Sequence, residues 1–172
     1  IYMGTLGKVQ SHYIYTKKQR IREKSLDKLI LQELWMMNGN ENRFECGSMI
    51  ELKLKCRAAE CLKNVKFRFE IQFQDGTIAG TMFTSNGVDF NNNDEKEITL
   101  EMDTAHLTAG KYNVDIVAFV YDKFGNEGFL DGVYPGFVFE IDKKLNEHNE
   151  LVWLHQYWGH VHLHNVEIIN ER

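Results

Sequence analysis

The chain lacks a long apolar run, and it has too few cysteines for a disulfide framework. None of its apolar stretches approaches the roughly 20 residues that a helix needs to cross a bilayer. Its three cysteines are an odd number without metal-binding spacing, and Cys56 alternates with apolar residues as a small core side chain would. These absences favour a protein without disulfides in a reducing, cytoplasmic compartment.

Positive charge is also scarce. Lysine and arginine number 20 against 25 aspartate and glutamate, which gives a net charge of −5. Binding to nucleic acid needs a concentrated basic surface, so we expect no nucleic-acid partner. The one basic stretch, residues 17–24, is typical of a solvated linker or helix face.

Signatures of catalysis are missing as well. The chain has no Gly-x-x-x-x-Gly-Lys-Ser/Thr loop that could hold nucleotide phosphates, and its serines lack a nucleophile-elbow context. Asp115 and Asp131 could be posed as a glycosidase pair, but a chain with 25 acidic residues always offers such a pair. We therefore predict no enzymatic activity and no cofactor.

What the chain has in quantity is period-two alternation of apolar and polar residues. Such alternation gives each strand one apolar face and one polar, solvent-facing face, as in antiparallel sheets that pack against each other. Asn-Gly and Asp-Gly turns separate the runs. The alternating segments are 50–56, 65–73, 98–102, 112–121 and 137–141.

The most informative segment is 107–121. Gly110 precedes Tyr112 by two residues and opens an alternating strand, which is the pattern of a tyrosine corner in an immunoglobulin-like sandwich. There the tyrosine ring closes one end of the core and its hydroxyl bonds backbone a few residues upstream. We predict an all-β, antiparallel immunoglobulin-like sandwich over residues 26–145.

The two ends differ from this middle. Residues 1–25 show little alternation and contain the basic stretch, so we expect a linker or an N-terminal arm, and the chain could be a piece of a longer protein. Residues 146–172 give a polar connector and then a dense apolar and aromatic tail. Such a tail is too apolar to remain unpacked, so it should form a strand on its own sheet or on a partner's.

Taken together, residues 26–169 resemble the C-terminal carbohydrate-binding domain of the ATP-binding subunits of polysaccharide (O-antigen type) ABC exporters. The order of motifs carries the resemblance, although each is weak alone. The motifs are 29–35, 44–52, 62–71, 74–81, 84–87, Leu107-x-x-Gly110-x-Tyr112, 137–141 and 158–163. The resemblance implies a non-catalytic β-sandwich that binds an exported glycan and forms a homodimer with exchanged C-terminal strands. The family's ATPase lies N-terminal to this domain and has no counterpart in this chain.

Sugar recognition needs an aromatic side chain that stacks on the C–H face of the sugar ring. It also needs carboxylates and amides nearby that hydrogen-bond to the sugar hydroxyls. The strand 112–121 offers that mix on the face opposite its core residues, and the segment 122–134, which we expect to be a loop, adds further aromatics. Burial of this face beneath another element or a dimer partner is the alternative. The candidate carbohydrate-binding residues are Asn113, Asp115, Phe119, Tyr121, Phe129 and Tyr134.

Two segments could be considered as metal sites, but neither shows a complete set of ligands. If 159–164 is a strand, His160, His162 and His164 share one face, as zinc or nickel would require, but a polar strand face is the simpler account. Oxygen ligands for calcium occur in residues 89–94, where a polar turn is the simpler account. We predict no bound metal.

The resulting functional hypothesis is binding of an O-antigen-like cell-surface polysaccharide, presented to the membrane subunits of an ABC exporter at the inner face of the cell membrane. The alternative is a structural dimerisation module of a transporter ATPase subunit, without a ligand of its own.

Overall fold

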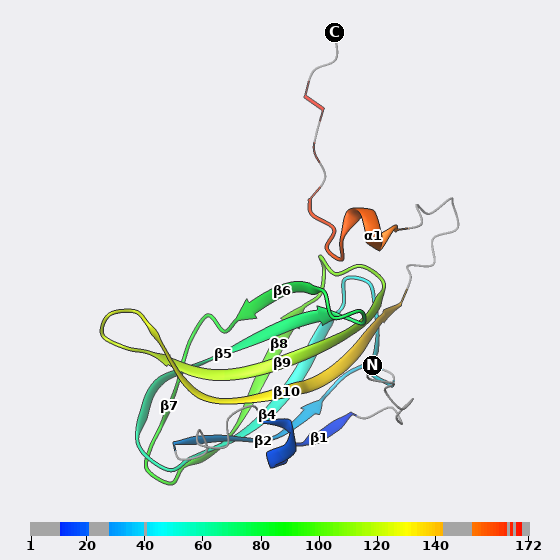
Figure 1. Cartoon of the computed structure of the whole chain (residues 1–172). Coiled ribbons are helices and arrows are strands. Elements are labelled where there is room, and N and C mark those ends of the chain that lie inside the picture. Colours follow the sequence, from blue (N-terminus) through cyan, green and yellow to red (C-terminus); the bar gives the residue numbers. More distant parts are fainter. Residues whose placement is uncertain are drawn as a thin grey trace.

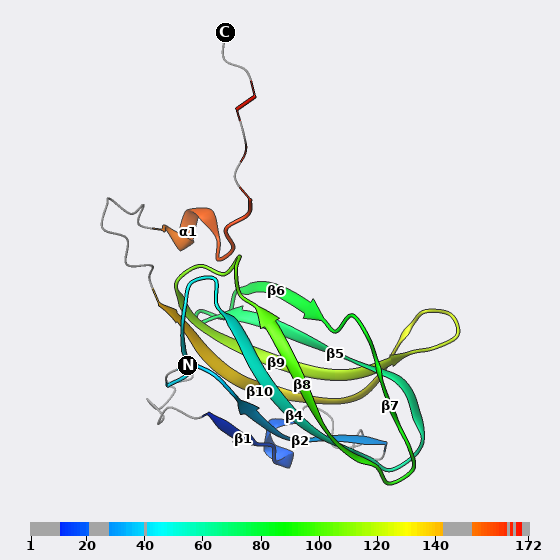
Figure 2. The same ribbon diagram turned by 180° about the vertical axis from the view of Figure 1, so that it is seen from behind.

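Two β-sheets pack face to face around one apolar core in the computed structural model (Figure 1). The structure describes residues 11–20, 28–39, 41–142, 153–164, 166, 168 and 169. Seen from behind, β4 and β8 of the first sheet lie in front of the second sheet (Figure 2).

The first sheet is antiparallel throughout, with the order β1-β2-β4-β8. The second has the order β3-β10-β9-β5-β6, with β7 paired to β5, and β3 runs parallel to β10. The strands are β1 (His12–Ile14), β2 (Leu29–Met36), β3 (Arg43–Glu45), β4 (Met49–Ala58), β5 (Leu62–Phe73), β6 (Ile78–Phe83), β7 (Val88–Phe90), β8 (Glu95–Asp103), β9 (Gly110–Tyr121) and β10 (Glu127–Asp142). The described residues also contain two short helical turns, η1 (Lys17–Gln19) and α1 (His155–Trp158).

This order confirms the predicted immunoglobulin-like sandwich. With β2, β4 and β8 taken as strands A, B and E, and β5, β9 and β10 as C, F and G, the two sheets are those of that fold. The alternation seen in the sequence sets the core: on β4, the side chains of Ile50, Leu52, Leu54 and Cys56 are all 0% exposed. Burying each large aliphatic side chain contributes roughly 1.5–3 kcal/mol, so these strands hold the two sheets together.

The tyrosine corner forms as predicted. The Tyr112 hydroxyl donates to the carbonyl of Thr108 at 2.7 Å, and the ring is 1% exposed. Gly110 has a φ of +150°, and a Cβ at that position would collide with the ring of Phe73. Glycine is therefore required where the chain enters β9.

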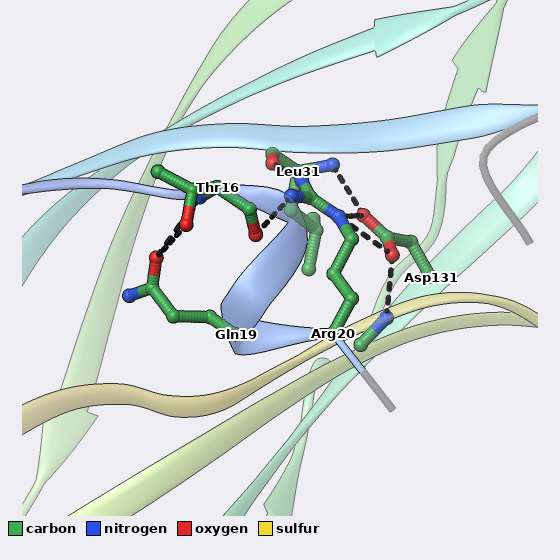
Figure 3. A network of polar contacts seen from close by, with 6 residues as sticks. Thr16, Gln19, Arg20, Leu31 and Asp131 are labelled. Atoms are coloured by element: carbon green, nitrogen blue, oxygen red, sulfur yellow. Dashed lines mark hydrogen bonds and ion pairs between the residues drawn. The ribbon is translucent and has the colours of Figure 1, made fainter. Parts of the chain in front are cut away.

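Residues 11–20 lie on the sandwich. β1 extends the first sheet beside β2, and the rings of Tyr13 and Tyr15 are 8% and 7% exposed within the core. Arg20 follows η1 and reaches Asp131 on β10, with Nε to Oδ2 at 3.2 Å (Figure 3). Asp131 also accepts hydrogen bonds from the backbone amides of Leu31 and Gly132 at 2.9 Å each. This buried ion pair joins the N-terminal segment to both sheets.

The prediction that residues 122–134 form a loop is wrong for most of this segment. Only 122–126 form a turn, in which Asp122 Oδ1 accepts from the amides of Phe124 and Asn126 at 2.8 Å each. β10 then begins at Glu127 and contains two register shifts, between Phe129 and Asp131 and between Val133 and Phe137. Each shift breaks the period-two pattern, and for this reason the sequence revealed only the part of β10 at 137–141 and not the part before it.

The C-terminal tail also differs from the strand considered for 159–164. α1 ends at Trp158, just before this segment, and the described residues of 159–164 form no strand, only a bridge between Val161 and Leu107. The polar connector predicted at 146–150 lies outside the described residues.

Candidate functional site

The side chains of β5 and β9 that point away from the core define a surface that we call the outer face. β5 pairs with β9 in a register that sets Glu70 opposite Asp115 and Gln72 opposite Asn113. Directly opposed residues of neighbouring strands have Cβ atoms about 5 Å apart. Two carboxylates and two amides therefore form one compact polar cluster.

Asp115 is the most perturbed group of this cluster. Its partial burial, with a smaller contribution from the charge on Glu70, raises its pKa to about 6. The Gln72 amide opposes the shift by donating to Asp115 Oδ2 at 2.8 Å. A carboxyl group with this pKa can accept or donate hydrogen bonds near neutral pH.

Arg68 fixes the edge of the polar cluster. Its Nε donates to Glu70 at 2.6 Å, and its Nη1 donates to Glu127 at the start of β10. One guanidinium group thus holds two carboxylates on different strands. Paired charges of this kind keep their side chains in fixed orientations.

Tyr134 borders the cluster on the other side. It lies in the register shift of β10 that faces Asp115, within 133–137. A Cβ on Gly132 would lie 2.7 Å from the Tyr134 hydroxyl oxygen, so the tyrosine ring packs directly over this glycine. The missing side chain lets an aromatic ring lie close to the sheet.

The other aromatic candidates lie at the hairpin end of the sheet. Phe119 is 0% exposed and packs edge-on against Phe83 and Tyr121, at centroid distances of 6.1 and 5.2 Å. Tyr121 is 50% exposed, and Phe129 pairs with Phe119 across the strands.

The six predicted residues thus fall into two groups. Asn113 and Tyr121 are separated along β9 by roughly 26 Å at about 3.3 Å per residue. Asn113, Asp115 and Tyr134 form a polar group, and Tyr121 and Phe129 an aromatic one beside the buried Phe119. The face of β9 that we expected to be either free or covered is covered at Phe119 and partly open at Asp115.

Sequence reasoning did not nominate Arg68, Glu70 or Gln72. Their alternation with core residues made the wet face of β5 visible, but only the pairing of β5 with β9 places them beside Asp115.

Other constellations considered from the sequence find structural roles. Asp131 points into the sandwich toward Arg20, whereas Asp115 lies on the outer face, so the two do not form a glycosidase pair. Asp89 accepts from the Asn64 amide and pairs with Lys63, which fits a polar turn. Among the described residues, no group of three or more His, Cys, Asp or Glu side chains could hold a metal ion.

Comparison with known proteins decides the family. The model of the Wzt C-terminal domain matches residues 29–154, which is most of the chain. The chain belongs to this family. The Wzt C-terminal domain is a non-catalytic domain associated with polysaccharide ABC exporters.

A solved structure has the same fold. The crystal structure of the C-terminal domain of wzt superposes on this chain with a TM-score of 0.58 at 9% sequence identity, and the match covers 73% of this chain and 84% of that one. Among curated proteins, none matches the sequence. Within the described residues, no helix is both long and apolar enough to cross a membrane.

Proposed function

We propose that the outer face binds a cell-surface polysaccharide of the O-antigen type for recognition by an ABC export system, and that the chain makes or breaks no bond in doing so. The observation that carries the proposal is the pairing of Glu70 with Asp115 and of Gln72 with Asn113, beside the ring of Tyr134. Membership of the Wzt C-terminal domain family supports it.

The chemistry of the face suits a sugar polymer. Carboxylates and amides hydrogen-bond to hydroxyl groups, and Arg68 and Gln72 hold them in place before a ligand arrives, which lowers the entropy lost on binding. Tyr134 and the half-exposed Tyr121 offer aromatic surface for the apolar side of a sugar ring. Phe129 adds to the aromatic group, and the buried Phe119 packs edge-on against Tyr121.

The assembly that we propose is a homodimer with exchanged C-terminal segments, docked on the membrane subunits of the exporter at the inner face of the cell membrane. Apolar side chains in the tail are largely exposed: Leu163 at 74%, Val166 at 95%, Ile168 at 84% and Ile169 at 96%. Contiguous exposed apolar groups mark a surface that a partner covers. Two sites in one dimer would increase the avidity for a repetitive glycan.

Calorimetry with the purified polysaccharide of the producing strain tests the ligand. We expect binding by the wild type and a loss of about tenfold in affinity for Asn113→Ala and for Asp115→Ala, because each removes hydrogen bonds to sugar hydroxyls. Glu101→Ala, an exposed change on β8 of the other sheet, is the matched control and should bind as the wild type does.

Three results would count against the site or the function. Wild-type affinity in both folded variants places the site elsewhere. Affinity lost only in Tyr121→Ala moves it to the hairpin end. A chain that is dimeric yet binds no glycan favours the alternative, a structural dimerisation module.

A further inference from the structure

A groove at the other end of the sandwich lies between the β5–β6 turn and the C-terminal tail. It encloses about 890 Å³. We call it the tail groove and define it by Gln74, Asp75, Thr77, Ile78, Trp153 and Trp158, which are among its lining residues. In Figure 1 the tail segment with α1 lies beside this end of the sheets, away from the β9–β10 hairpin.

The tail wall of the groove is firmly attached. The His160 ring, 8% exposed, stacks on Phe73 at 4.0 Å between centroids, and the His160 carbonyl accepts from the Thr108 amide at 3.2 Å. His155 stacks on the same phenylalanine at 4.4 Å. The tail thus forms a wall of the groove held by both ring and backbone contacts, and in the proposed exchanged dimer the tail of the partner would make the same contacts.

The two walls are chemically different. Trp153 and Trp158 pack edge to face at 5.5 Å, the Trp153 indole donates to the Gly159 carbonyl at 2.7 Å, and Trp158 is 43% exposed. The facing turn supplies the amide of Gln74 and the carboxylate of Asp75. Aromatic surface opposite hydrogen-bonding groups suits a sugar ring, which has apolar C–H faces and hydroxyl edges.

The tail groove continues the outer face. Gln74 is the next outward residue after Gln72 along the chain, and Ile78 pairs with Gln72 across the β5–β6 hairpin. From Glu70 to Gln74 the strand advances roughly 13 Å at about 3.3 Å per residue. That span is longer than one sugar ring, so a polymer bound at Asp115 can extend along β5 into the groove.

We propose that the tail groove is a second subsite for the same polysaccharide, with Trp158 as its aromatic platform. This inference rests on the proposed glycan binding at the outer face. It makes affinity depend on glycan length: fragments of one repeat unit occupy the outer face alone, and longer fragments also contact Trp158.

Calorimetry with graded fragments of the producing strain's polysaccharide tests this dependence on the full chain. We expect Trp158→Ala to weaken binding of fragments of several repeat units by about tenfold and to leave single-unit binding unchanged. Tyr157→Ala is the matched control, because Tyr157 neighbours Trp158 on α1, is 74% exposed and does not line the groove. It should bind all fragments as the wild type does.

The outcomes separate this inference from the function on which it rests. If single units bind, Asp115→Ala weakens their binding about tenfold and Trp158→Ala changes nothing at any length, the second subsite is refuted while the outer-face site stands. If no fragment binds, both fail. If Trp158→Ala shifts light scattering from dimer to monomer, the groove holds a second copy of the chain and the glycan subsite is refuted.

Discussion

At the scale of single residues, the hydroxyl of Tyr112 joins the start of β9 to the turn before it. It donates to the Thr108 carbonyl, a buried bond of 2.7 Å. We expect Tyr112→Phe to lower the free energy of unfolding by about 1–2 kcal/mol, as for the loss of one buried hydrogen bond. Urea denaturation measures it, with Tyr121→Phe at a half-exposed position as the control. Equal stabilities of the Tyr112→Phe variant and the wild type would contradict a structural role for this hydroxyl.

Asp115 illustrates the opposite case, a residue that costs stability. Its pKa is raised to about 6 by burial and by Glu70, so the folded state favours the protonated form. The contribution of Asp115 to the free energy of unfolding is fully present below pH 3.8, the pKa of the group in the unfolded chain. It is lost as the pH rises through about 6, the pKa in the folded chain.

We therefore expect Asp115→Asn to raise the free energy of unfolding at pH 8 by about 1–2 kcal/mol, a value reduced for solvent screening. This increase in the free energy of unfolding should vanish near pH 4, because the Asp115 carboxyl is then protonated in the folded chain. Urea denaturation at both pH values tests this, and a stabilisation that does not change with pH would exclude the charge as its cause. A stability cost at this position fits a binding residue, because binding surfaces often retain groups that do not favour the fold.

At the scale of elements, the N-terminal segment is held by one buried ion pair. The side chains of Arg20 and Asp131 are 4% and 0% exposed, and burial raises the pKa of Asp131 despite the opposing amide and guanidinium partners. Arg20→Ala leaves a buried carboxylate without its counter-charge and should cost about 3 kcal/mol or more.

Arg43→Ala provides the matched control for this experiment. Arg43 pairs with Asp142 at 2.7 Å on the surface, where its side chain is 52% exposed. Losing such an exposed pair should cost less than about 1 kcal/mol. Equal losses for the two variants in urea denaturation would show that burial of the Arg20 pair is irrelevant.

The tail segment has a pH-dependent attachment. Burial lowers the pKa of His160, the nearby His155 lowers it further, and Asp75, with its Oδ2 3.9 Å from His160 Nε2, opposes the shift. The Nδ1 atoms of His155 and His160 lie 2.8 Å apart. One proton fits between the two nitrogen atoms, but a proton on each would clash. Docking of the tail is therefore complete above pH 6.5, the ordinary pKa of a histidine side chain. It weakens as the pH falls through the lowered pKa of His160.

Hydrogen exchange of the Thr108 amide, which bonds the His160 carbonyl, reports on this docking. We expect its protection to fall between pH 7 and pH 5 in the wild type. His12→Gln, on the first sheet, should keep this dependence. A protection that stays constant over the range would disprove the effect.

At the scale of the whole molecule, we expect a dimer in solution. The substitutions Ile168→Asp and Ile169→Asp together should give a monomer by light scattering at micromolar concentration, because charge on these exposed apolar positions opposes burial against a partner. His164→Asp is the control at an exposed polar position of the same tail. A wild-type chain that is itself monomeric would refute the exchanged dimer.

The sequence by itself determined the sandwich, because alternation decides which face of each strand is buried, and Gly110 with Tyr112 marks one corner of the fold. It could not determine the part of β10 before residue 137, where register shifts break the period of two, nor the contact of Arg20 with Asp131, which are 111 residues apart. The candidate site divides in the same way. Asn113 and Asp115 follow from alternation on one strand, whereas Glu70, Gln72 and the tail groove exist only where separate strands meet. Which strands become neighbours depends on how the whole core packs, and that was decided by the tertiary structure.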